Sequence, residues 1–172
     1  MLAIVALALT PLAAQATTVD FEVMSAANSS NDGTGLTTSI FLTVGDAFSV
    51  TADYLDTWVL GSTLAHVGNA DGLTSFSDYT LGNLTTLYGT LVGMIGAGDF
   101  FAIGTYYFGN ANVTGELKLF NWDSYSGDNT GSITATVYVG VDLPEVPLPA
   151  TGLLLVGALG GFGLARRKRK TA

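Results

Sequence analysis

The central part of the chain alternates between apolar and polar residues with a period of two. The clearest stretches are 47–52, 115–120 and 132–139, which are rich in β-branched and aromatic residues. Because successive side chains of a strand point to opposite faces of the sheet, this pattern predicts strands with one buried face. Residues 88–95 and 100–105 are more continuously apolar and predict buried strands. The central part shows no long stretch with the 3.6-residue period of an amphipathic helix.

Turn sequences separate these stretches at short intervals. Asn, Asp and Gly gather at residues 31–33, 45–46, 68–72 and 127–129, and these residue types favour tight turns. Many short strands joined by such turns predict an all-β domain over residues 17–140, a β-sandwich of jelly-roll type. The chain has no cysteine, so this domain has no disulfide framework, and a domain of this size can fold without one.

The first 16 residues predict a signal helix. Residues 2–9 are apolar, and Ala14 and Ala16 form the A-x-A pattern of small residues that signal peptidase requires. The apolar run is too short to cross a bilayer. We therefore expect export through the Sec machinery and cleavage by signal peptidase before Thr17.

The other end of the chain predicts a membrane anchor. A linker, 141–147, leads to an apolar segment of about residues 148–165, and the basic tail 166–170 (RRKRK) follows it. A short transmembrane helix with a basic end remains in the inner membrane with that end in the cytoplasm. Pro147 and Pro149 keep the residues before the helix extended, which leaves them accessible to a processing enzyme.

Residues 146–150 carry the motif for such an enzyme: Val146, Pro147, Leu148, Pro149 and Ala150. With the glycine-rich apolar segment and the basic tail, the region 146–170 resembles the VPLPA-CTERM class of PEP-CTERM-like sorting signals. This resemblance implies processing by an exosortase-type transpeptidase, and then a location at the cell surface or outside the cell. Residues 148–152 also spell LPATG, which fits the LPxTG signal of sortases. We favour the exosortase because Val146 and Pro147 complete the VPLPA motif and the glycine-rich helix adjoins it directly.

Charge is distributed unevenly between the two parts. Residues 17–145 contain all 14 acidic residues and one basic residue, Lys118, which gives this part a net charge of about −13. Such a charge argues against nucleic acid and anionic membrane surfaces as partners. Divalent cations and neutral sugars remain compatible with it.

The sequence indicates no enzyme. Its single histidine, His66, has no serine and carboxylate arranged around it as in a hydrolase, and we expect it in a loop. The glycines at 93, 96 and 98 follow a predicted strand but do not form a phosphate-binding fingerprint.

The segment 121–132 (NWDSYSGDNTGS) is the clearest candidate for a binding site. It places two carboxylates, an amide and several backbone carbonyls between two predicted strands. Ca²⁺ takes six to eight oxygen ligands of these kinds, and the absence of soft ligands argues against zinc or copper. A solvated hairpin without any metal would have the same composition.

From Tyr88 onward the sequence resembles the galactophilic lectin A-like (PA-I) family, in the order YGTLVGMIG, FFAIGT and GELKLFNWDSYSGDNTGSITATVYVG. Upstream of Tyr88 the same family order continues at residues 38–40, 45–46, Trp58 and 71–73. The resemblance implies a β-sandwich with a calcium-dependent galactose site. The calcium loop is two residues shorter here, and Gly68 stands at the position of the family's sugar-contacting histidine.

The resemblance also implies the residues of the site. Calcium would be held by the carboxylates of Asp123 and Asp128, the amide of Asn129, the backbone carbonyl of Tyr125 and a carbonyl near Leu60. Sugar would be contacted by Asp71, Asp123, Asp128 and Asn129. Four large aromatic residues could either stack on a sugar ring or fill the core: Trp58, Trp122, Tyr106 and Tyr107.

Together these observations predict an exported, surface-sorted protein whose domain binds a galactoside-like carbohydrate with the help of calcium. The alternative is a structural protein of the extracellular matrix or biofilm, which would use the same sandwich and the same anchor without binding a ligand.

Overall fold

The computed structural model describes residues 17–31, 34–61 and 66–140. The expected signal peptide, linker and sorting signal lie outside these residues, so the structure does not test them. Within the described ranges, no helix has the length and apolar character needed to cross a membrane. The described residues belong to one compact unit.

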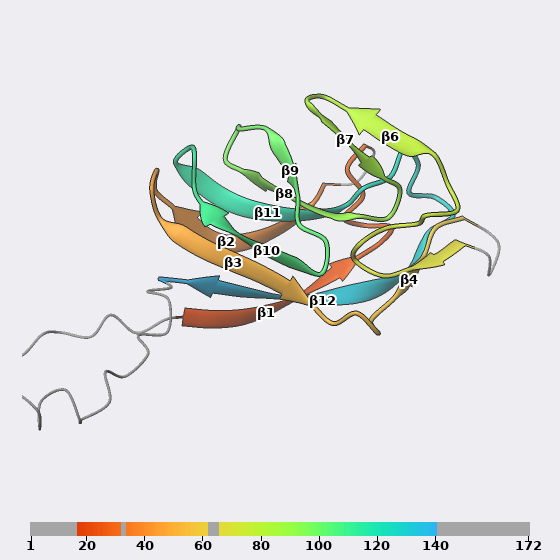
Figure 1. Cartoon of the computed structure of the whole chain (residues 1–172), viewed down its shortest axis with the longest axis horizontal. Helices are drawn as coiled ribbons and strands as arrows, with labels where there is room; N and C mark the ends of the chain where they lie inside the picture. Colours follow the sequence, from red (N-terminus) through yellow and green to blue (C-terminus); the bar gives the residue numbers. More distant parts are fainter. Residues whose placement is uncertain (1–16, 32–33, 62–65, 141–172) are drawn as a thin grey trace, which may run out of the picture. The chain divides into compact units, whose positions relative to one another are not determined.

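The described residues form an all-β domain, as the alternating pattern predicts (Figure 1). The larger sheet has six strands, and its order is β10 (Tyr106–Asn110), β3 (Ala47–Ala52), β12 (Thr130–Val139), β4 (Trp58–Val59) and β5 (Val67–Gly68), with β1 (Thr17–Met24) also paired to β12. The smaller sheet has the order β2 (Leu36–Leu42), β11 (Gly115–Asn121), β8 (Leu91–Ile95) and β9 (Phe100–Ala102). A separate hairpin consists of β6 (Asp78–Leu81) and β7 (Leu84–Leu87).

Two predicted strands are shorter than their apolar runs. The run 88–95 becomes a strand only from Leu91, because Thr90 N donates to Leu87 O and closes a turn before it. The run 100–105 ends as a strand at Ala102, since Ile103 N and Gly104 N both turn to the carbonyl of Leu91. Local hydrogen bonds that the hydrophobic pattern does not reveal set both ends.

Strand β12 pairs along both of its edges. On one edge it pairs with all of β1, from Thr17↔Val139 to Met24↔Ser132. On the other edge it pairs first with β3 and then with β4. Residues 53–57 leave the sheet between these two partners, and there a carboxylate oxygen of Asp56 accepts a hydrogen bond from Thr134 N at 2.7 Å. The side chain thus replaces a backbone partner that the strand would otherwise lack.

The core lies between the two sheets. Inward-facing side chains of both sheets belong to one buried cluster, among them Phe48 and Val50 of β3, Leu91 of β8, Leu117 of β11 and Val137 of β12. Phe48 contacts Phe101 of the other sheet edge to face, with ring centroids 6.1 Å apart. The chain crosses from one sheet to the other between β2 and β3. It crosses again at each of the three steps from β9 to β10, β11 and β12, a connectivity typical of jelly-roll sandwiches.

A second, smaller cluster lies on the outer face of the smaller sheet. Val92, Phe120 and Trp122 are buried there against the hairpin of β6 and β7. The indole nitrogen of Trp122 donates to the carbonyl of Tyr79 in β6 at 2.9 Å. The hairpin therefore covers this face of the sheet (Figure 1) and brings Tyr79 of β6 beside Trp122, which follows β11.

The burial of Trp58 gives a prediction about stability. Its indole nitrogen donates to the carbonyl of Gly89 at 3.0 Å, and the side chain is fully buried. Trp58→Phe leaves that carbonyl without a partner and should lower the free energy of unfolding by about 1–3 kcal/mol, as measured by urea unfolding. The control is Tyr106→Phe on exposed β10, which should change it by less than about 0.5 kcal/mol. Equal stability of the two variants would contradict this account of the core.

Candidate functional site

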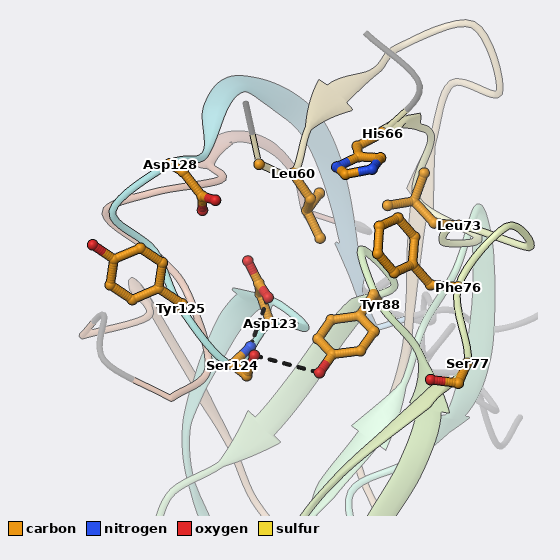
Figure 2. A pocket seen from close by; sticks show the side chains of 11 residues that line it. Leu60, His66, Leu73, Phe76, Ser77, Tyr88, Asp123, Ser124, Tyr125 and Asp128 are labelled. Carbon is orange, nitrogen blue, oxygen red and sulfur yellow. Dashed lines mark hydrogen bonds between the residues drawn. The ribbon is translucent and has the colours of Figure 1, made fainter. Parts of the chain in front are cut away.

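The loop between β11 and β12 forms one side of a hollow of about 430 Å³ at the end of the sandwich. Figure 2 shows the hollow, with Asp123 at its base and Asp128 at its rim. Eleven residues from four parts of the chain line it: Leu60, Gly61, His66, Leu73, Phe76, Ser77, Tyr88, Asp123, Ser124, Tyr125 and Asp128. The structure therefore brings together four of the five residues expected to bind calcium, and the fifth, Asn129, joins them through hydrogen bonds.

Asp123 is the most buried carboxylate in this group, with only 6 % of its surface exposed. One carboxylate oxygen accepts from the backbone N–H of Ser124 at 2.7 Å, and the other accepts from the side-chain amide of Asn129 at 2.6 Å. Both donors are neutral. The carboxylate is thus hydrogen-bonded, but neither of these two partners balances its negative charge.

The pKa of Asp123 is raised above its ordinary value of 3.8. Burial is the largest cause, because removal from water disfavours the charged form. Hydrogen bonds from Asn129, Ser124 and Tyr125 act in the opposite direction, and the negative charge of Asp128 raises the pKa further. A cation bound between the two carboxylates would relieve both unfavourable effects.

Asn129 connects the loop to the end of β4. Its side-chain oxygen accepts from Gly61 N at 3.3 Å, while its amide nitrogen donates to Asp123. Next to Gly61, Leu60 N donates to the carbonyl of His66 at 3.0 Å. We call residues 122–129, between β11 and β12, the acidic loop. These hydrogen bonds hold Leu60 and its backbone carbonyl beside this loop, although the two are far apart in sequence.

Gly61 is required at this position by both conformation and space. Its φ of 83° lies in the region that side chains rarely adopt. A Cβ atom there would lie 2.8 Å from Nδ1 of His66 and 3.5 Å from a carboxylate oxygen of Asp128. His66 and Asp128 therefore approach the same point of the backbone, and the histidine belongs to the lining of the hollow.

The chemistry of the expected donors can be compared with that of calcium. These donors are two carboxylates, the amide oxygen of Asn129, which accepts from Gly61 N, and the backbone carbonyls of Tyr125 and Leu60. All are hard oxygen ligands, of the kinds that Ca²⁺ takes. Within the described ranges, no three His, Cys, Asp or Glu side chains are grouped closely enough to hold a metal. Backbone and amide oxygens would therefore have to complete the coordination here.

The opposite wall of the hollow is apolar and aromatic. The ring of Phe76 lies edge to face against His66 at 4.5 Å and against Tyr88 at 5.9 Å. The hydroxyl of Tyr88 lies 3.4 Å from that of Ser124, next to Asp123 (Figure 2). At the mouth Tyr125 exposes 60 % of its surface. Phe76 and Tyr88 were not predicted as site residues, because they stand 47 and 35 positions before Asp123 and no local pattern links them to its loop.

Asp71 lies in a different place. Its two carboxylate oxygens accept from the backbone N–H of Thr105 at 2.7 Å and from the hydroxyl of Thr105 at 3.2 Å. It lines a separate hollow together with Tyr54, Leu55 and Gly68. The structure therefore does not bring Asp71 together with Asp123, since its carboxylate holds the turn after β9.

The four large aromatic residues divide between core and surface. Trp58 and Trp122 are fully buried, and both indole N–H groups donate to backbone carbonyls. Tyr107 packs in the core against Phe48 and Phe101, with centroid distances of 5.3 and 4.8 Å. Tyr106 is 66 % exposed on β10. None of the four lines the hollow at Asp123.

Comparison with known proteins places the fold. No family model and no curated protein sequence matches the chain. Among solved structures, it is similar to the N-terminal domain of EclA, described as a PllA-like lectin, with a TM-score of 0.53 and 22 % identity over 70 % of this chain and 94 % of that one. The domain thus has a lectin-like fold. At this identity the likeness concerns the arrangement of the strands.

The two carboxylates give a prediction about protonation in the metal-free chain. Asp128→Asn removes the repulsion that raises the pKa of Asp123 and should lower that pKa, as followed by carboxyl carbon NMR. Asp78→Asn, in the hairpin, should leave it unchanged. Because folding raises the pKa of Asp123, its contribution to stability is most favourable below pH 3.8 and is lost as the pH rises through the folded pKa. An unchanged pKa in Asp128→Asn would show that the two carboxylates do not interact.

Proposed function

We propose that residues 17–140 form a calcium-dependent carbohydrate-binding domain. The observation that supports this most directly is the meeting of Asp123, Asn129 and the Leu60–Gly61 segment at one hollow, with Asp128 at its rim. These groups come from the ends of three strands and have a mixed oxygen donor set. The lectin-like fold adds support from the arrangement of the strands.

The residues that would hold the ion are Asp123, Asp128 and Asn129 with the carbonyls of Tyr125 and Leu60. A bound calcium ion supplies coordination positions for the hydroxyl groups of a sugar. The carboxylates accept hydrogen bonds from those hydroxyls, and the amide of Asn129 holds Asp123 in place at 2.6 Å.

The walls of the hollow indicate what kind of sugar it accepts. Two carboxylates at one wall, in a domain with a net charge of about −13, repel acidic sugars and favour neutral ones. The rings of Phe76 and Tyr88 on the other wall can pack against the apolar C–H face of a pyranose. A neutral hexopyranoside such as a galactoside meets both conditions.

We further propose that the domain is exported and sorted to the cell surface. The two ends of the sequence support this proposal: residues 1–16 as a signal peptide and 146–170 as a sorting signal for an exosortase-type transpeptidase. The register of β1 and β12 is also suitable, because Thr17 pairs with Val139. Both ends of the domain thus lie at the far end of β12 from Thr130, which adjoins the acidic loop.

Calcium dependence can be tested by thermal unfolding of the full chain in mild detergent. Millimolar Ca²⁺ should raise the melting temperature relative to EDTA, because a ligand that binds only the folded state stabilises it by about 2.7 kcal/mol at 100 times its Kd. The double variant Asp123→Ala/Asp128→Ala should abolish the shift. As a matched control, Asp78→Ala/Asp99→Ala removes two exposed carboxylates from the β6–β7 hairpin and the β8–β9 turn and should retain it. Equal melting temperatures of the unaltered chain in both buffers would favour a structural matrix protein instead.

Sugar binding can be separated from calcium binding at the aromatic wall. Phe76→Ala should weaken the affinity for a neutral galactoside by roughly five- to tenfold, since one ring contact contributes about 1 kcal/mol. The affinity of this variant for calcium should stay the same, because the side chain of Phe76 carries no oxygen that could bind the ion. Phe41→Ala on β2 removes an equally large and more exposed ring outside the hollow and should change neither affinity. Titration calorimetry with calcium and then with the galactoside measures both. Unchanged galactoside affinity in Phe76→Ala would rule out this wall as part of the sugar site.

A further inference from the structure

The segment between β1 and β2, residues 25–31 (SAANSSN), lies against the acidic loop. It runs beside the end of β11: Asn121 N donates to Asn28 O, Ser30 N donates to Asn121 O, both at 2.9 Å, and Ser29 forms a parallel bridge with Asn121. Ser25, Asn28 and Ser29 are buried although all three are polar. A polar segment therefore continues the smaller sheet where β11 leads into Asp123.

The hydroxyl groups of this segment bind the backbone of Asp123. The hydroxyl of Ser30 donates to Asp123 O and accepts from Asp123 N, both at 3.1 Å. One hydroxyl can do both, since it has one donor and two acceptor positions. Ser29 adds a second donor to the same carbonyl at 3.3 Å. The backbone on both sides of the Asp123 side chain is thus fixed by side chains more than 90 positions away.

The same segment also reaches the rest of the acidic loop. Asn31 donates through its side chain to Ser124 O at 2.8 Å. At the other end of the loop, Ser25 N donates to Gly131 O at 3.0 Å, and Ser25 O accepts from the amide of Asn129 at 3.4 Å. Segment 25–31 therefore holds both the start and the end of the loop that contains the expected ligands.

Buried polar atoms under the loop indicate that stability is not the only constraint on these residues. The hydroxyl of Ser25 and the side-chain oxygen of Asn121 are fully buried and have no hydrogen-bond partner among the described residues. Such groups lower stability relative to apolar ones of similar size. Buried polar groups without a partner depart from the rule that favours stability, and such departures are typical of functional sites.

We propose that segment 25–31 positions the calcium site before the ion binds, and that Ser30 is its main positioning residue. The inference rests on the proposed calcium site. Ser30 contacts the backbone of Asp123 and none of the expected ligand atoms, so it acts through Asp123. A loop that is already ordered loses less conformational entropy on binding than one that has to be ordered by the ion.

Titration calorimetry of the full chain with CaCl₂ tests this role. Ser30→Ala removes both hydrogen bonds between the hydroxyl of Ser30 and the backbone of Asp123. It should weaken the affinity for calcium by about three- to tenfold, because the loop is then less ordered before the ion binds. Asn31→Ala removes the bond to Ser124 from an exposed position, where folding is least affected, and should weaken the affinity in the same direction.

The matched control is Thr38→Val. It removes another hydroxyl that donates to a β11 carbonyl, that of Leu117 at 2.7 Å, but outside the loop and with little change of shape. It should lower the melting temperature of the metal-free chain and leave the Kd for calcium unchanged, which is how a purely structural bond behaves.

Two results would overturn the inference in distinguishable ways. If the unaltered chain binds calcium and both Ser30→Ala and Asn31→Ala bind it equally well, the segment only supports the fold, and the proposed function stands. If the unaltered chain binds no calcium, the proposed function fails and the inference fails with it.

Discussion

The pairing of β12 along both edges is the constraint on which the domain depends. This ten-residue strand aligns β1 on one side and β3 and then β4 on the other. Its inward residues Ile133, Ala135 and Val137 are fully buried in the main core. Because Thr130 and Gly131 pair with Val59 and Trp58, the same strand also fixes where the acidic loop ends relative to the Leu60–Gly61 segment. The place of the hollow is thus a consequence of strand register.

The hollow combines two environments that the sandwich supplies from opposite directions. The acidic wall follows from the ends of β11 and β12, where Asp123 and Asn129 are held by hydrogen bonds. The aromatic wall consists of side chains from residues 66–88. It is continuous with the second cluster, because the ring of Tyr79 stacks on Tyr88 at 5.1 Å and contacts Trp122 at 5.4 Å. The hairpin of β6 and β7 therefore supports one wall of the hollow, although its strands pair only with each other.

The polar segment 25–31 shows how a loop with few apolar contacts can still have a defined shape. Its hydroxyl and amide groups replace the packing that a short glycine-containing loop lacks. The hydrogen bonds join residues about 90 positions apart in sequence, so they form only when β1 and β11 are both in place. The order of the acidic loop is in this way coupled to the folding of the whole sandwich.

The sequence by itself determined the class of fold and the chemistry of one loop. Period-two alternation at 47–52, 115–120 and 132–139 marked β3, β11 and most of β12, because the pleat of a strand imposes that period locally. The composition of 121–132 likewise pointed to an oxygen-rich loop. Only the tertiary structure decided which residues share the hollow. It put Phe76, Tyr88 and His66 opposite Asp123, directed Asp71 to Thr105, and buried both tryptophans. These outcomes depend on pairing between strands far apart in sequence, and no local pattern specifies which distant strand a segment will meet.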